Sequence, residues 1–193
     1  MATVKKIGVL GGSFNPAHNG HLEISCQTME KLNLDEIWWI ITSKNPFKDA
    51  KTYLSLDKRI KIAKEVIKDN KIKIHSFEEK INSPYTVDLI NHLKQSYDDN
   101  FVWIMGSDNI NDFKKWKSYE TILNNIKIVI CNRPNYEFNS ENLQDFLGCG
   151  TNLIFKDEIN DFMKNDNGIV LINSTNNYTS STKIRKNKIY GKE

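Results

Sequence analysis

One stretch near the start of the chain combines residue types that bind phosphate: Gly11-Gly12-Ser13-Phe14-Asn15-Pro16-Ala17-His18-Asn19-Gly20-His21, directly after the apolar run 7–10. Glycines let backbone N–H groups approach an anion closely, and a helix start offers unpaired N–H donors and a positive dipole end. His18 and His21 are three residues apart, so both imidazoles lie on one helix face. The pattern predicts a phosphate-binding site after a first strand and needs no metal. The alternative is that one histidine caps a turn and the other packs in the core.

A second anion-binding pattern lies near the other end of the chain, at Thr179-Ser180-Ser181-Thr182-Lys183-Ile184-Arg185. Ser181 or Thr182 can cap a helix while the hydroxyls and the first N–H groups bind anionic oxygens. Arg185, one turn further on, falls on the same side and adds a forked donor. The alternative is an ordinary cap with a solvated arginine. Because an apolar strand precedes it, we predict a second phosphate clamp.

Two further segments also suggest ligand contacts. Gly106-Ser107-Asp108 follows the apolar run 101–105, where glycine permits close approach and an aspartate commonly accepts ribose hydroxyls. A helix N-cap is the alternative there. Trp116, among lysines, is a candidate stacking plate for a flat ring or else a core anchor. Lys48 could contact a phosphate, but the sequence alone favours a solvated side chain at this position.

Elements at βαβ spacing must position these residues. We predict strands over 5–10, 36–42, 71–76, 101–105, 126–131 and 168–172. Apolar helix faces are marked by Leu22, Cys26, Met29 and Leu32, then by Leu56, Ile60, Ala63 and Ile67 after a Ser55 cap, and then by Val87, Ile90 and Leu93. This alternation predicts an α/β, Rossmann-like, doubly wound and mainly parallel sheet with helices on both faces. Ligands then bind at the carboxyl ends of strands, near the switch in strand order.

The remaining patterns are interpreted as structural. His75 and His92 stand alone, and Trp38-Trp39 is expected to pack against both faces of the sheet. Residues 133–152, with a short helical stretch over 141–147, are interpreted as a variable excursion within one domain spanning 1–193.

Composition limits the function classes. The formal charge of +3 comes from 27 basic and 24 acidic residues spread along the chain, which argues against a nucleic-acid partner. The three cysteines have no metal-type spacing and suggest free thiols. The first strand begins at once, and no apolar run approaches the roughly 20 residues that cross a bilayer, so we expect a cytoplasmic protein without a membrane partner.

The two terminal motifs resemble a known family. The histidine element resembles the (H/T)xGH signature of the nucleotidylyltransferase superfamily, and GGSFNPAHNGH together with SSTKIR is similar to bacterial nicotinate-nucleotide adenylyltransferases. Three internal segments agree in order and spacing: Pro46-Phe47-Lys48, Tyr85-Thr86-Val87-Asp88, and Gly106-Ser107-Asp108 with Trp116. In place of the family's usual loop histidine the chain has Phe47, and it stops soon after SSTKIR.

The resemblance implies transfer of AMP from ATP to nicotinate mononucleotide in NAD biosynthesis, giving deamido-NAD and pyrophosphate, with Mg²⁺ held mainly by the ATP phosphates. His18, His21 and Arg185 would be catalytic. The implied nucleotide contacts are Gly11, Ser13, Phe14, Gly106, Asp108, Ser181 and Thr182. The implied contacts of the mononucleotide are Lys48, Tyr85, Thr86 and Trp116.

Other functions stay open from the sequence. The same chemistry could act on nicotinamide mononucleotide or phosphopantetheine, and a non-catalytic nucleotide- or RNA-binding module could use the same cleft. A two-histidine metal hydrolase lacks a third ligand at recognisable spacing. Oligomeric state is not predicted.

Overall fold

A seven-stranded sheet organises the chain. The computed structural model describes residues 3–42, 54–132, 153–154, 159–173, 181–182 and 184–185. The strand order is β3-β2-β1-β4-β5-β7-β6, and every neighbouring pair is parallel. The strands are β1 (Lys6–Gly12), β2 (Glu36–Ile41), β3 (Ile72–His75), β4 (Asn100–Gly106), β5 (Lys127–Asn132), β6 (Leu153–Ile154) and β7 (Gly168–Asn173).

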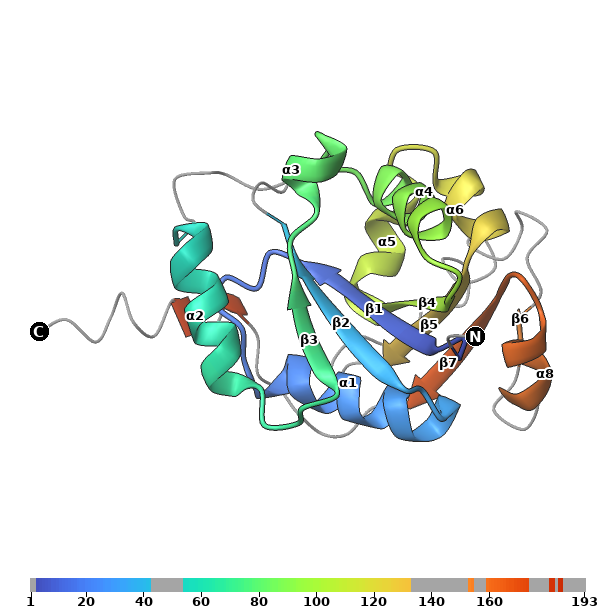
Figure 1. The fold of residues 1–193 in the computed structure, drawn as a ribbon, viewed down its shortest axis with the longest axis horizontal. Coiled ribbons are helices and arrows are strands. Elements are labelled where there is room, and N and C mark those ends of the chain that lie inside the picture. Colours follow the sequence, from blue (N-terminus) through green and yellow to red (C-terminus); the bar gives the residue numbers. More distant parts are fainter. Residues whose placement is uncertain are drawn as a thin grey trace, which may run out of the picture.

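Helices cover both faces of this sheet, which confirms the predicted doubly wound α/β fold (Figure 1). One buried cluster joins the sheet to α4 (Thr86–Ser96), α5 (Ile110–Phe113) and α6 (Tyr119–Asn125). The other joins it to α1 (Asn19–Leu32), α2 (Leu56–Val66) and α8 (Ile159–Lys164). Trp38 belongs to the first cluster and Trp39 to the second, as the alternation of side chains along a strand requires.

The six predicted strands all form, and their ends differ from the predictions by at most a residue or two. The seventh, β6, is two residues long and forms only by pairing with β7. The predicted cap of α2 is confirmed, because the Ser55 hydroxyl accepts a hydrogen bond from the Lys58 N–H at 3.4 Å. The four-residue helices α3 (Glu78–Ile81) and α5 were not predicted, since one turn carries no periodicity.

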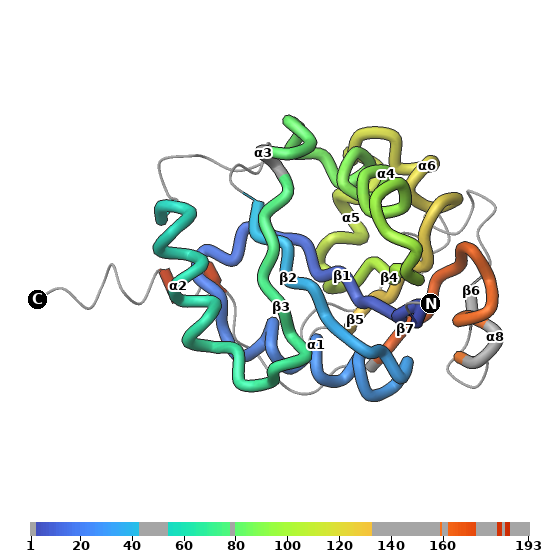
Figure 2. Tube along the Cα trace, in the orientation of Figure 1, coloured from blue at the N-terminus to red at the C-terminus, as the bar shows by residue number. Residues whose placement is uncertain are grey.

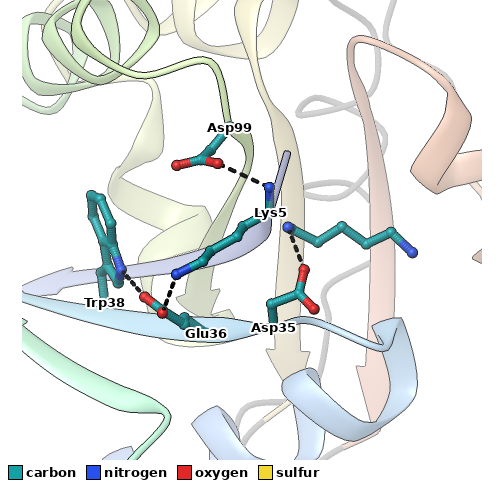
Figure 3. Close-up of polar contacts among 6 residues, drawn as sticks. Lys5, Asp35, Glu36, Trp38 and Asp99 are labelled. Atoms are coloured by element: carbon teal, nitrogen blue, oxygen red, sulfur yellow. Dashed lines mark hydrogen bonds and ion pairs between the residues drawn. The ribbon is translucent and has the colours of Figure 1, made fainter. Parts of the chain in front are cut away.

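Polar side chains hold the strands together at the amino edge of the sheet (Figure 3). The Lys5 ammonium contacts the Glu36 carboxylate at 2.7 Å, and the Trp38 Nε1–H donates to the same carboxylate at 3.0 Å. Asp99 and Asp35 accept from the backbone N–H groups at positions 5 and 6. This bonding lowers the pKa of Glu36, chiefly through the Lys5 hydrogen bond. The contacts set the register of β1 against both neighbours and leave the opposite edge for the site.

His75 packs within an aromatic group on the first face. Its ring lies 4.4 Å from the Trp38 ring and is stacked on Phe77 at 5.5 Å. Its Nε2 is buried and has no hydrogen-bond partner among the described residues. These contacts fit the structural interpretation of this histidine.

We expect His75→Phe to make folding stability less dependent on pH. Burial lowers the pKa of His75 from its ordinary value of 6.5, so below that pH the unfolded chain binds a proton that the folded chain does not. Stability contributed by the neutral ring is therefore lost as the pH falls below about 6.5. Uptake of one full proton on unfolding would change the free energy of unfolding by about 1.4 kcal/mol per pH unit. Because the ring is only half-buried, the contribution of His75 stays well below that value. Melting temperatures between pH 7.5 and 5.5 test this, and equal slopes for both proteins would contradict it.

Some predictions lie outside the described residues: Lys48, the excursion 133–152 with its helical stretch, and Cys149. Cys26 and Cys131 are free thiols, as predicted, and burial raises the pKa of Cys26. Among the described helices none is long and apolar enough to cross a membrane.

Candidate functional site

The strand order reverses between β1 and β4, and both glycine-containing motifs lie at this point. The chain runs from β1 outward to β2 and β3, then returns to place β4 on the other side of β1. Leu10 is level with Ile104, so Gly12 and Gly106 end neighbouring strands at the same edge. This is where ligands bind in open α/β sheets.

The two histidines form a capping box at the start of α1. His18 is the N-cap, and its Nδ1 accepts a hydrogen bond from the Gly20 N–H at 3.1 Å. The Nδ1 of His21 accepts from the His18 N–H at 3.2 Å, and the ring centroids are 3.8 Å apart. Because each Nδ1 accepts a bond, each neutral ring carries its proton on Nε2. The predicted turn cap therefore exists, and it orients the Nε2–H donors without excluding a catalytic role.

Phe14 and Trp39 pack against the His21 ring of the imidazole pair. The Phe14 ring is stacked on Trp39 at 4.9 Å and lies 4.7 Å from the His21 ring. The Trp39 Nε1–H donates to the Ser25 hydroxyl at 2.8 Å, and Ser25 donates in turn to the His21 carbonyl. Phe14 is only 2% exposed and has a positive φ of 43°. Its contacts are those of a support, and its contact with a nucleotide stays a prediction.

The C-terminal motif meets the histidine motif directly. The Ser181 hydroxyl donates to the Pro16 carbonyl at 2.8 Å, and the Arg185 guanidinium donates to the Asn15 carbonyl at 2.5 Å. Arg185 also donates to the Thr182 hydroxyl at 3.2 Å. Figure 2 shows residues 181–182 and 184–185 next to the turn that leads from β1 into α1. Two segments more than 160 residues apart thus lie together, as the sequence predicts.

Gly11 and Trp116 both pack against the buried indole of Trp103. A Cβ at Gly11 would overlap the Trp103 ring, so the close packing itself requires glycine there. Trp103 also contacts Trp116 edge-on, with ring centroids 6.4 Å apart. Trp116 is half-buried and also packs on Phe113 at 5.0 Å. The core-anchor interpretation of Trp116 is therefore met, while stacking on a ligand stays a prediction.

Asp108 lies within a short 3₁₀ helix, η2 (Ser107–Asn109), immediately after β4. The N-cap of this helix is Gly106, and no side chain makes a capping bond there. The Asn109 amide instead donates to the Gly106 carbonyl at 3.2 Å. Asp108 is therefore not the cap that the alternative interpretation supposed.

Tyr85 and Thr86 open helix α4 next to a lysine that the sequence did not single out. Tyr85 is the N-cap and is 37% exposed. The Lys117 ammonium lies 4.7 Å from the centre of the Tyr85 ring and 3.0 Å from the Asp88 carboxylate. The Ser83 hydroxyl also donates to Asp88 at 2.5 Å, and this hydrogen bond is the largest single cause that lowers the pKa of that carboxyl. Since Trp116 precedes Lys117, the predicted ring-binding residues lie in one region.

No group of three or more His, Cys, Asp or Glu side chains gathers as a metal site within the residues that the structure describes.

Comparison with known proteins assigns the family. The family model described as cytidylyltransferase-like matches residues 9–187. A probable nicotinate-nucleotide adenylyltransferase of Pelagibacter ubique is 44% identical over 136 residues, which are 70% of this chain and 75% of that protein. This chain belongs to the nicotinate-nucleotide adenylyltransferase family. A second member, from Methylorubrum extorquens, is 39% identical over 68% of this chain and 71% of its own.

A solved structure agrees with this family's fold. The nicotinic acid mononucleotide adenylyltransferase of Plasmodium falciparum, complexed with NaAD, has a TM-score of 0.73 at 21% identity and covers 94% of this chain and 83% of its own. At that identity the likeness concerns the fold. The curated relatives therefore show the family, and the solved structure shows the fold.

Proposed function

We propose that this chain transfers the adenylyl group of ATP to nicotinate mononucleotide, giving deamido-NAD and pyrophosphate. The observation that carries the proposal is the contact of Ser181 and Arg185 with the turn that precedes His18. Two donor-rich segments meet at the end of β1, where a triphosphate can lie between them. Family membership supports the same reaction, as the step in NAD biosynthesis.

The reaction needs alignment and charge stabilisation rather than a covalent intermediate. An oxygen of the mononucleotide phosphate bonds to the α-phosphorus of ATP, while the bond from that phosphorus to the bridging oxygen breaks and pyrophosphate leaves. A phosphate monoester is already a nucleophile near neutral pH. The protein must hold two repelling anions in line and stabilise charge on the leaving group. The Nε2–H groups of His18 and His21 are the donors on one side, and Arg185 is the cation on the other.

The remaining site residues are assigned within this scheme. Gly11, Ser13 and Phe14 lie beside the nucleotide, Gly106 and Asp108 beside a ribose, and Ser181 and Thr182 beside the β- and γ-phosphates. Tyr85, Thr86 and Trp116 surround the pyridine ring, and Lys48 meets the mononucleotide phosphate. Mg²⁺ would be held mainly by the phosphates of ATP, because this ion binds readily through substrate oxygens and its own waters. His18, His21 and Arg185 present N–H donors rather than the oxygen ligands that Mg²⁺ prefers, which is compatible with an ion held by ATP oxygens and water.

The same proposal covers organisation and location. The family model spans 9–187, which favours a single nucleotidylyltransferase domain over residues 1–193. We place the protein in the cytoplasm, where ATP and free thiols coexist.

The proposal is tested by measuring pyrophosphate release from ATP with each acceptor in turn. We expect rapid release with nicotinate mononucleotide, less with nicotinamide mononucleotide, none with phosphopantetheine and none with ATP alone. Preference for either other acceptor would replace the proposed substrate. If none of the acceptors gave pyrophosphate release, and the protein bound RNA with an affinity that falls steeply with salt, the binding-module alternative would be favoured.

A further inference from the structure

Arg59, which no sequence motif marks, is the most buried charged side chain of the described residues, at 1% exposed. It lies in the first turn of α2, on the face that packs against the sheet. A buried guanidinium is costly unless its donors are satisfied, so its contacts reveal its purpose. It donates to three backbone carbonyls, those of Leu54, Ser13 and Thr42, at 3.0, 2.6 and 2.7 Å.

These three carbonyls come from segments that the site depends on. Ser13 follows β1 in the phosphate-binding turn, Thr42 follows β2, and Leu54 precedes α2. Thr42 and Leu54 also border residues 43–53, which include Lys48. One side chain therefore joins the turn proposed for ATP to both borders of the segment proposed for the acceptor phosphate.

Asn15 extends the same set of hydrogen bonds to the C-terminal motif. Its side-chain oxygen accepts from the Leu54 N–H at 3.0 Å, and its backbone carbonyl accepts from Arg185 at 2.5 Å. Asn15 is 2% exposed, so water competes little for these bonds. Hydrogen bonds thus lead from Arg59 through Leu54 and Asn15 to Arg185.

We propose that Arg59 is a positioning residue that fixes the 13–16 turn relative to residues 42 and 54, so that the two substrates are held in line. The expected effect of Arg59 on catalysis rests on the proposed function, whereas its structural role rests on the hydrogen bonds alone. Arg59 touches no substrate in this scheme. Its planar fork reaches separate carbonyls at once, which the single ammonium of a lysine does less well.

The test compares Arg59→Lys with a control on the same helix, Ala63→Gly. Ala63 is fully buried one turn further along α2, and its replacement by glycine weakens the helix without touching residues 13, 42 or 54. Assays are run at a temperature where both variants are folded. We expect Arg59→Lys to lower kcat at saturating substrates at least about tenfold, and Ala63→Gly to keep kcat and both KM values within about twofold.

A second readout does not depend on turnover. In the ligand-free protein, the Leu54 amide should exchange its hydrogen at least about tenfold faster in Arg59→Lys than in the wild type or in Ala63→Gly, because its acceptor Asn15 is no longer held. Unchanged exchange, or a kcat loss that Ala63→Gly reproduces, would overturn the positioning role. If the wild-type protein turned over no acceptor, the proposed function would fall, and the exchange rates would still decide on Arg59.

Discussion

His18→Asn is expected to lower kcat about 10²-fold while leaving the fold as stable as before. Asparagine is a good N-cap, so its side-chain oxygen can replace Nδ1 as the acceptor for the Gly20 N–H. Its shorter amide does not place an N–H where the Nε2–H of His18 lies, and in the proposed mechanism that N–H donates to the phosphates. Loss of one such donor typically costs on the order of 3 kcal/mol of barrier. Steady-state pyrophosphate release and thermal unfolding measure the two effects separately.

His18→Ala is the matched comparison, because it removes both the cap and the donor. We expect the same loss of kcat and, in addition, about 1 kcal/mol of stability, or roughly 2–4 °C in melting temperature for a chain of this size. If His18→Asn kept turnover within twofold of the wild type, the histidine would be a cap only.

Gly11→Ala is expected to destabilise the protein by about 1–3 kcal/mol, because the added methyl would overlap the Trp103 ring. The clash lies between a strand backbone and a fully packed indole, neither of which can move freely. Gly12→Ala is the control, since a Cβ there would meet the Phe14 ring only at an ordinary 3.6 Å. Chemical denaturation of both variants gives the comparison.

A double mutant identifies the cause. Trp103→Phe shortens the ring that Gly11 faces, and it removes an Nε1–H that has no acceptor within the described part of the chain. Gly11→Ala should therefore cost less in the Trp103→Phe background than in the wild type. Equal costs in both backgrounds would show that the Trp103 contact is not the reason for glycine at this position.

The elements that carry strong local patterns were predictable. Apolar runs of four or five residues predicted β1, β2, β4, β5 and β7, and the spacing of Val87, Ile90 and Leu93 predicted α4. Strand β6 was not predictable, because two residues have no pattern and form a strand only through the partner β7. The order of the strands around β1 depends on tertiary packing and was not predictable. The fold class alone nevertheless predicted that ligands bind at the carboxyl ends of strands, near the switch in strand order.

The candidate site also contains residues that the sequence predicts and residues that it does not. The terminal motifs were predictable because each contains donors at helical spacing. Arg59 was missed because an arginine on an amphipathic helix is usually solvated, and its burial depends on three carbonyls far away in the sequence. Trp103 was missed because a tryptophan in a buried strand is ordinary core. Lys117 was noticed only as part of a charged setting, and its contacts with Tyr85 and Asp88 depend on how α4 packs.

The central claim is that the segments around His18 and Arg185 hold one triphosphate between them. A crystal structure of this protein with a non-hydrolysable ATP analogue tests it most directly. The account predicts that the imidazole Nε2 atoms and the Arg185 guanidinium lie within hydrogen-bond distance, about 2.7–3.2 Å, of oxygens on the same triphosphate. A triphosphate bound elsewhere, or an Arg185 that bonds only to Asn15 and Thr182 while the nucleotide occupies the site, would contradict it.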